Sequence, residues 1–235
     1  MAVKIDRLIR SKRKTTAIIV EVDGTVTVRA PKRARRADIE AFVAAKEAWI
    51  RKKQALAREQ FPMVAPKQYV EEELFFYLGV QYPLMLVARQ RPALTLLEGK
   101  FCLAQAAQPR GRETFERWYR AQARAVVGER AAHYAAQFGF TFKKLRINGA
   151  RTRWGSCSSS GALNFTYRLV MAPLDVIDYV VIHELVHFEH PNHSQTFWGR
   201  VAALWPEYKE QKAWLDQNGR MLTLDGMETR KRGHR

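Results

Sequence analysis

The sequence predicts an α+β protein, because strand-like segments and long helical segments follow one another without strict alternation. β-Branched residues flank Asp23-Gly24 on both sides within residues 15–29. Short apolar stretches, interrupted by glycine and proline, occupy residues 69–103. Apolar residues also recur at helical spacing over residues 37–60.

The segment TTAIIVEVDGTVTVR at residues 15–29 predicts a β-hairpin, because Asp-Gly readily adopts the positive φ angles of a two-residue turn. Residues 37–60 predict one helix, which Pro62 and Pro66 close. The remaining pattern predicts short strands over residues 69–103, a long helix over 113–138 and a strand over 141–147. It then predicts a strand or hairpin around Gly161 over residues 151–170. Three more helices follow, over residues 173–190, from 195 onward and over 206–219.

The composition is that of an ordinary globular protein, with 47% hydrophobic and 27% charged residues. No stretch approaches the roughly 18 uninterrupted apolar residues of a membrane span, so we expect no membrane association. The N-terminal residues are charged throughout and lack the apolar core of a secretory signal. Two cysteines, Cys102 and Cys157, are too few for a secreted protein that is held together by several disulfides. We therefore expect a cytoplasmic protein.

The formal net charge is +17, and much of it is concentrated near the N-terminus. Residues 7–36 hold ten Lys and Arg against two acids, Glu21 and Asp23. A field of this sign attracts polyanions, which suggests a weak association with nucleic acid through the basic surface. Charge alone carries no specificity, so a solvated basic face without a dedicated partner fits equally well.

Four of the six histidines fall within residues 183–193, and two of them form the pattern His183-Glu184-Leu-Val-His187. On a helix, residues i and i+4 lie one turn apart on one face, so both imidazoles can bind one Zn²⁺. Glu184 can take the proton of a metal-bound water and act as general base. The helix is otherwise apolar almost all round, and metal binding would satisfy these polar groups inside it.

A catalytic zinc site needs a third protein ligand. His193 lies six residues after His187, and Pro191-Asn192 can stop the helix and turn the chain back. Glu207, twenty residues after His187, is the alternative. Of the two, the spacing favours His193.

These features predict three regions along the chain. Residues 1–110 form a β-rich N-terminal subdomain that contains the hairpin and one helix. Residues 111–225 form the metal-binding catalytic domain, and residues 226–235 form a basic tail.

RTRWGSCS at residues 151–158 and APLDVIDYVVIHELVHFEHPNHSQTFW at residues 172–198 resemble the YgjP-like metal-dependent hydrolases. These are zincin metallopeptidases related to the SprT-like and WLM proteases. VRAPKR after the hairpin, WIRKK in the first helix, YLG at residues 77–79 and PEY at residues 206–208 also fit. The resemblance therefore covers most of the chain.

The resemblance implies a zincin-like fold, in which the active-site helix packs on a twisted, mostly antiparallel sheet. RTRWGSCS would then form the edge strand beside the metal cleft. It also implies one Zn²⁺ per chain, with His183, His187 and His193 as ligands and Glu184 as the catalytic residue. Where the family commonly has Asn-Trp-Arg-Leu, this chain has Thr-Tyr-Arg-Leu at residues 166–169, so any role of that Asn or Trp is not carried over.

Several other residues have both a functional and a structural interpretation. Arg151 and Arg153 alternate on a predicted strand, so together they can clamp a substrate carboxylate or phosphate, or simply form a charged outer face. Tyr167 can donate a hydrogen bond to the substrate or pack as an ordinary aromatic. Cys157 is expected as a small apolar residue. Asp178 is expected to stabilise the positive end of its own helix.

Three functions fit this pattern. The first is a metallopeptidase that cleaves a peptide or protein substrate through Glu184 and the metal. The second, implied by the resemblance, is a nucleotide pyrophosphatase of the UTP type that uses the same site. No phosphate-binding loop or acidic Mg²⁺ cluster is visible in the sequence, which favours the peptidase. The third is a nucleic-acid-associated protease, although no separate DNA-binding module is recognisable.

Overall fold

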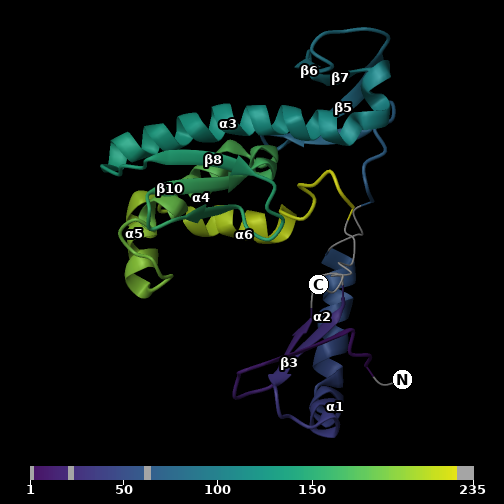
Figure 1. Ribbon diagram of the computed structural model, residues 1–235, viewed down its shortest axis with the longest axis vertical. Coiled ribbons are helices and arrows are strands. Elements are labelled where there is room, and N and C mark those ends of the chain that lie inside the picture. The colour runs from purple at the N-terminus through teal and green to yellow at the C-terminus, as the bar shows by residue number, and fades with distance from the viewer. Residues whose placement is uncertain (1–2, 21–23, 61–64, 227–235) are drawn as a thin grey trace. The chain divides into compact units, whose positions relative to one another are not determined.

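The computed structural model describes residues 3–20, 24–60 and 65–226, with the side chains of residues 56–60 excepted (Figure 1). The chain divides into two compact units. We call residues 1–66 with 225–235 the N-terminal unit, and residues 67–224 the main unit. No helix of the described residues is both long enough and apolar enough to span a bilayer.

The N-terminal unit pairs a small sheet with two helices. Its strand order is β1-β3-β2, with β1 parallel and β2 antiparallel to β3. One face of β3 presents Val26, Val28 and Ala30, which are fully buried against Ile39, Val43 and Ile50 of the helices. The elements are β1 Arg7–Ser11, β2 Ala17–Val20, β3 Val26–Pro31, α1 Arg36–Ala45 and α2 Glu47–Gln60.

The predicted hairpin forms, but its register differs from that of a two-residue turn at Asp23-Gly24. Val20 pairs with Val26, whereas a two-residue turn at Asp23-Gly24 would pair Val20 with Thr27. Asp23 itself lies outside the described residues. The single helix predicted over residues 37–60 is two helices, because Lys46 leaves the helical region at φ −108° and ψ 12° and its N–H bonds to the Val43 carbonyl.

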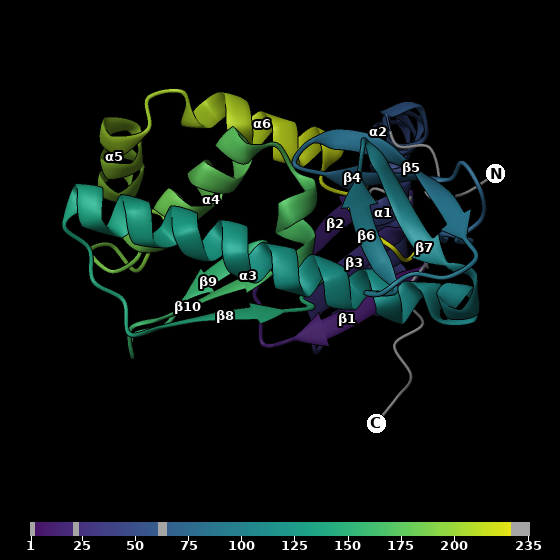
Figure 2. The same cartoon turned by 90° about the horizontal axis from the view of Figure 1, so that it is seen from above.

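The main unit contains two sheets around a long helix, α3. One sheet has the order β4-β5-β7-β6 and the other β8-β10-β9. In Figure 2, α3 runs across the whole unit, and it contacts both β8 and α4. The elements are β4 Leu74–Tyr77, β5 Val80–Val87, β6 Leu94–Leu97, β7 Lys100–Ala104, the 3₁₀ turn Gln105–Arg110, α3 Gly111–Phe138, β8 Lys144–Asn148, β9 Gly155–Cys157, β10 Ala162–Thr166, the 3₁₀ turn Tyr167–Met171, α4 Leu174–Val186, α5 Gln195–Leu204 and α6 Tyr208–Asn218.

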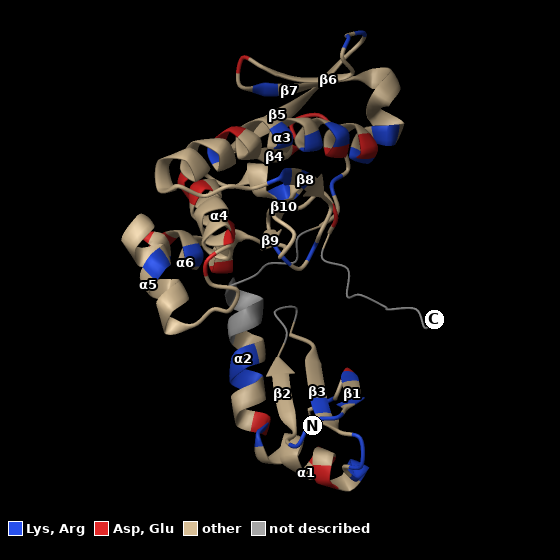
Figure 3. Ribbon diagram, turned by 60° about the vertical axis from the view of Figure 1, so that its left-hand side comes forward, with Lys and Arg blue, Asp and Glu red and all other residues tan. Residues whose placement is uncertain are grey.

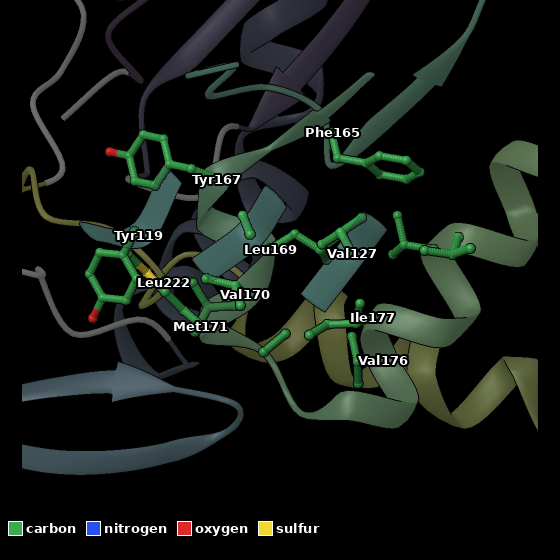
Figure 4. Packing of buried hydrophobic residues seen from close by; sticks show 14 of the residues in the cluster. Tyr119, Val127, Phe165, Tyr167, Leu169, Val170, Met171, Val176, Ile177 and Leu222 are labelled. Carbon is green, nitrogen blue, oxygen red and sulfur yellow. The ribbon is translucent and has the colours of Figure 1, made fainter. Parts of the chain in front are cut away.

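The core of the main unit crosses the boundary that the sequence predicted between residues 110 and 111. Phe75 of β4 stacks on Phe115 of α3 at 4.1 Å between ring centroids, and Phe101 of β7 lies 5.2 Å from the same ring. Deeper in the core, side chains interdigitate from α3, β10, the 3₁₀ turn Tyr167–Met171 and α4 (Figure 4). The boundary therefore falls at residues 66/67, because the four strands before α3 share its hydrophobic core.

The sheet beside α4 is mixed rather than mostly antiparallel, since β10 pairs parallel to β8 and antiparallel to β9. β9 is one of the two edge strands of this sheet and begins only at Gly155. Arg151 and Arg153 therefore precede the strand and do not alternate along it.

α4 is buried almost all round, as its apolar sequence predicts. The helix ends at Val186 rather than near His190, and His187 is its C-cap with helical φ and ψ angles. His183 and His187 consequently remain one turn apart on the same face. The segment after α4 then turns back, and Ser194 caps α5 by accepting a hydrogen bond from the Phe197 N–H.

Candidate metal centre

Three imidazoles converge at the end of α4. His183 comes from the helix, His187 from its C-cap and His193 from the segment that leads into α5. Ring nitrogens of the three lie within 4.8 Å of one another. His183 and His187 come together through helical spacing, whereas His193 arrives through the turn after His190.

The geometry of these nitrogens fits a metal ion. His183 Nε2 and His193 Nε2 lie 3.0 Å apart, close to the roughly 3.4 Å that a tetrahedral ion with Zn–N bonds of 2.0–2.1 Å imposes on two ligands. His187 Nδ1 donates to the His190 carbonyl over 3.0 Å, which leaves Nε2 of that ring for the metal. His183 Nδ1 is buried without a partner among the described residues, a cost that coordination at Nε2 can offset.

The surroundings of His183 and His187 favour the neutral imidazole, which is the form that binds a metal. Burial lowers the pKa of His183 to about 3, and the neighbouring His187 and His193 rings add to the shift. Burial also lowers the pKa of His187, although the hydrogen bond to the His190 carbonyl opposes this.

Glu184 lies against β9, and the strand is shaped to receive it. A Cβ on Gly155 would lie 2.6 Å from both Cγ and Oε1 of Glu184, so only glycine admits the carboxylate here. The Cys157 N–H donates to this carboxylate. Oε2 is buried and has no partner among the described residues. The carboxylate is thus held by the Cys157 N–H, while Oε2 remains available to accept a further hydrogen bond or a proton.

Burial raises the pKa of Glu184 to about 8, against the lowering effects of the Cys157 N–H and of Arg153. This environment favours a carboxyl group that readily holds a proton. A group of that kind can both accept and return a proton near neutral pH.

A cleft of about 860 Å³ opens over this cluster. One wall is the edge strand β9 with the residues that flank it, and the other is α4. α6 contributes Lys212, Leu215 and Asp216 to the lining, where Lys212 and Asp216 form an exposed ion pair at 2.7 Å. Phe188 and Pro191, which follow α4, also line it.

The structure separates the three residues predicted to bind substrate. Arg153 lines the cleft. Arg151 does not line it in the described structure, and its carbonyl accepts a hydrogen bond from Arg168 Nη1 at 3.2 Å. Tyr167 is buried in the core, where its ring stacks on Tyr119 at 6.5 Å, so the interpretation as a packed aromatic holds.

Other candidate residues also have definite positions. Asp178 does not act at the end of its helix, because Arg130 of α3 pairs with it through two hydrogen bonds of 2.6 and 2.7 Å. Glu207 precedes α6 and is not part of the histidine cluster among the described residues. Cys102 and Cys157 are both free thiols, so the one disulfide that the sequence permits does not form.

Tyr179 and Trp198 line the cleft and were not singled out from the sequence. Tyr179 precedes His183 by four residues, so the helical spacing that identified His187 would also have placed it on this face. Burial raises its pKa to about 12, with contributions from Asp216, Tyr208 and Glu184. Trp198 stacks on His193 at 5.7 Å, a contact that depends on the turn after α4 and leaves no sequence signal.

Comparison with known proteins identifies the family. A family model described as YgjP-like, metallopeptidase domain, matches residues 14–218. No curated protein matches the chain. Among solved structures, the crystal structure of the metallopeptidase zymogen of Pyrococcus abyssi abylysin matches with 23% identity and a TM-score of 0.35, covering 38% of this chain and 90% of that one. Since the family model spans most of the chain, the protein belongs to the YgjP-like metallopeptidase family.

Proposed function

We propose that this protein is a zinc metallopeptidase in which His183, His187 and His193 hold the metal and Glu184 is the general base. Family membership implies a metal-dependent peptidase. The observation that carries the finer proposal is the convergence of three imidazoles beside a buried, unpartnered oxygen of Glu184. Three nitrogen ligands with an open position are the ligand set of catalytic zinc sites.

A bound Zn²⁺ would polarise the scissile carbonyl and lower the pKa of a coordinated water. The protein's own contribution is proton transfer and alignment. Glu184 Oε2 faces no protein donor among the described residues and can accept the proton of the attacking water, and the same carboxyl can return that proton to the leaving amine. The Cys157 N–H holds the carboxylate against β9 throughout, so its orientation is set before substrate arrives.

The form of the cleft favours an extended peptide over a compact substrate. β9 is an edge strand, and residues 155–159 line the cleft along its length. An extended peptide can add to such an edge through main-chain hydrogen bonds, which places successive carbonyls at a fixed depth. Arg153, which precedes the strand, can bind a carboxylate of the peptide.

The variant Glu184→Gln tests this proposal. It keeps the shape of the side chain and removes the base, so we expect about one zinc per chain and a loss of peptidase activity of roughly 10²-fold to 10⁴-fold, as removal of a general base typically produces. Metal content by mass spectrometry and hydrolysis of an unfolded protein are the two measurements. Unchanged activity at full metal content would rule Glu184 out as the base.

A matched pair of histidine variants tests the ligand set. His193→Ala should weaken zinc binding, because it removes a ring nitrogen from the cluster. His190→Ala should leave zinc binding intact, because His190 contributes its backbone carbonyl to His187. Hydrolysis of UTP, measured beside the protein substrate, distinguishes the pyrophosphatase alternative. If Glu184→Gln abolishes only UTP hydrolysis, the metal site stands and the peptidase assignment falls.

A further inference from the structure

Basic residues from two distant segments meet at one end of the sheet in the N-terminal unit. β1 and β3 are parallel and β2 is antiparallel to β3, so the last residues of β1 and β3 and the first residues of β2 lie at the same end of the sheet. Residues 12–16 connect β1 to β2 at this end, and residues 32–35 connect β3 to α1. The Lys32 N–H donates to the Ser11 carbonyl over 3.1 Å, which joins the two segments.

These two segments bring together five cations that we call the basic edge. None of the five forms an ion pair with an acid in the part of the chain that the structure describes. The neighbouring Arg35 and Arg36 differ, because Asp38 and Glu40 already neutralise them at 2.9 and 2.8 Å. The basic edge consists of Lys12, Arg13, Lys14, Lys32 and Arg33.

Arg10 holds one segment of the basic edge in place. Arg10 Nη1 donates to the carbonyls of Lys32 at 3.1 Å and Ala34 at 2.6 Å, so its guanidinium fixes the second segment in place. Arg13 Nε is buried without a partner among the described residues. Gathering like charges costs electrostatic free energy, and a polyanion would recover it. Figure 3 shows Lys and Arg clustered on the loops at the α1 end of this sheet.

We propose that the basic edge binds the phosphate backbone of double-stranded nucleic acid. Duplex DNA presents about one negative charge per 1.7 Å of its axis, a density that five clustered cations can match. The same segments contain Thr15 and Thr16, whose hydroxyls suit phosphate oxygens. Residues 12–16 and 32–35 contain no aromatic side chain on which a single strand could stack, so the duplex is the better fit.

A lipid surface is the competing partner, because Leu8 and Ile9 on β1 are 40% and 36% exposed. Both lie on the strand itself, however, and the loops that carry the cations have only Thr15, Thr16 and Ala34 between the charges. A segment that inserts into a membrane surface places large apolar side chains beside its cations, and these two loops contain none. The composition of the loops therefore favours nucleic acid.

The test compares two quadruple variants of the full chain. The first, K12A/K14A/K32A/R33A, removes four cations of the basic edge. The second, K100A/K143A/K144A/K209A, removes four exposed lysines of the main unit and matches the decrease in charge. Binding of a fluorescent duplex is measured by anisotropy from about 50 to 200 mM salt, where counterion release makes affinity fall steeply.

We expect the basic-edge variant to weaken binding at least about tenfold and to lower the slope of log affinity against log salt by about 0.9 for each phosphate that is no longer bound. The lysine control should bind as the unchanged chain does. Equal weakening in both variants would reduce the effect to net charge and overturn the proposal. Binding of phosphatidylserine vesicles through the same residues, without duplex binding, would also overturn it. Peptidase activity is not part of the readout, so the proposal stands or falls separately from the metal centre.

Discussion

At the residue scale, the contact between Gly155 and Glu184 decides the geometry of the candidate site. The HExxH spacing on α4 identifies Glu184, and it says nothing about the strand that receives the carboxylate. The role of Gly155 follows from the packing of β9 on α4, since a Cβ at this position would lie 2.6 Å from Glu184. The motif therefore predicts the groups on the helix, while their orientation depends on a packing contact between distant residues.

Gly155→Ala should lower peptidase activity strongly while zinc content stays the same, because the added methyl displaces Glu184 and not the histidines. Gly128→Ala is the matched control. A Cβ at Gly128, inside α3, meets nothing within 4 Å, so this change should preserve activity and stabilise the helix by about 0.5–1 kcal/mol. Activity and metal content of the purified variants give the comparison. Full activity of Gly155→Ala would show that Glu184 has room to move.

Cys157 provides a pH-dependent measurement at the same scale. Burial raises the pKa of its thiol to about 11, and the charge of Glu184 adds to the shift. The reactive species is the thiolate, so at pH 8 only about one molecule in a thousand is reactive, against about one in ten for an ordinary thiol of pKa 9.0.

We therefore expect iodoacetamide to modify Cys157 of the folded, metal-free protein roughly 100-fold more slowly than the unfolded chain at pH 8. The rate should rise with pH toward 11. Cys102→Ala isolates the thiol of interest, and Glu184→Gln should shift the profile to lower pH by removing the nearby charge. Equal rates in folded and urea-unfolded protein at pH 8 would contradict the assigned environment.

At the element scale, the sequence predicts the long elements well and the short ones less reliably. α3, α5 and α6 lie close to their predicted bounds, because apolar periodicity and the flanking Gly and Pro residues mark them. β1 carries no such mark, since all of its residues are exposed and it pairs with the second strand of the hairpin. The break at Lys46 is likewise invisible, because apolar spacing continues across it.

The same scale includes a polar contact that sequence cannot reveal, between α3 and α4. Asp178 is 4% exposed and accepts from both Arg130 and the Tyr134 hydroxyl. The Asp178 carboxylate raises the pKa of the Arg130 guanidinium well above its usual range. Forty-eight residues separate the partners along the chain, so neither local propensity nor motif spacing connects them.

Arg130→Leu should destabilise the fold by about 3–5 kcal/mol, because it leaves the Asp178 carboxylate buried without its cation. The double variant R130L/D178L should recover much of this stability, since apolar replacement of both partners removes the buried charge altogether. Urea unfolding monitored by circular dichroism measures both. Equal destabilisation in the single and double variants would show that packing, rather than charge, dominates this contact.

At the scale of the whole molecule, two separate hydrophobic cores correspond to the two units. One core joins α3, α4 and both sheets of the main unit, and the other joins β3 with α1 and α2. An N-terminal subdomain and a catalytic domain are predictable from the sequence. The predicted boundary is wrong because the strands at residues 74–104 look like a continuation of the first hairpin, while their buried side chains pack on α3.

A chain of residues 67–224 should therefore fold and bind zinc by itself, since it contains its own core and all three histidines. Cooperative thermal unfolding and the metal content of this fragment check the expectation. Retained zinc would place the whole metal centre in the main unit. A fragment that fails to fold would show that the N-terminal unit contributes to the stability of the main unit.

The Lys67 N–H donates to the Leu224 carbonyl over 3.3 Å, so the first and last residues of the main unit are neighbours. A unit whose ends adjoin has the topology of a domain inserted into a host chain. A linker of a few residues could close it into a circle, and new ends could then be opened at a surface loop. The main unit is in this sense a self-contained part of the chain, because its two ends lie beside each other.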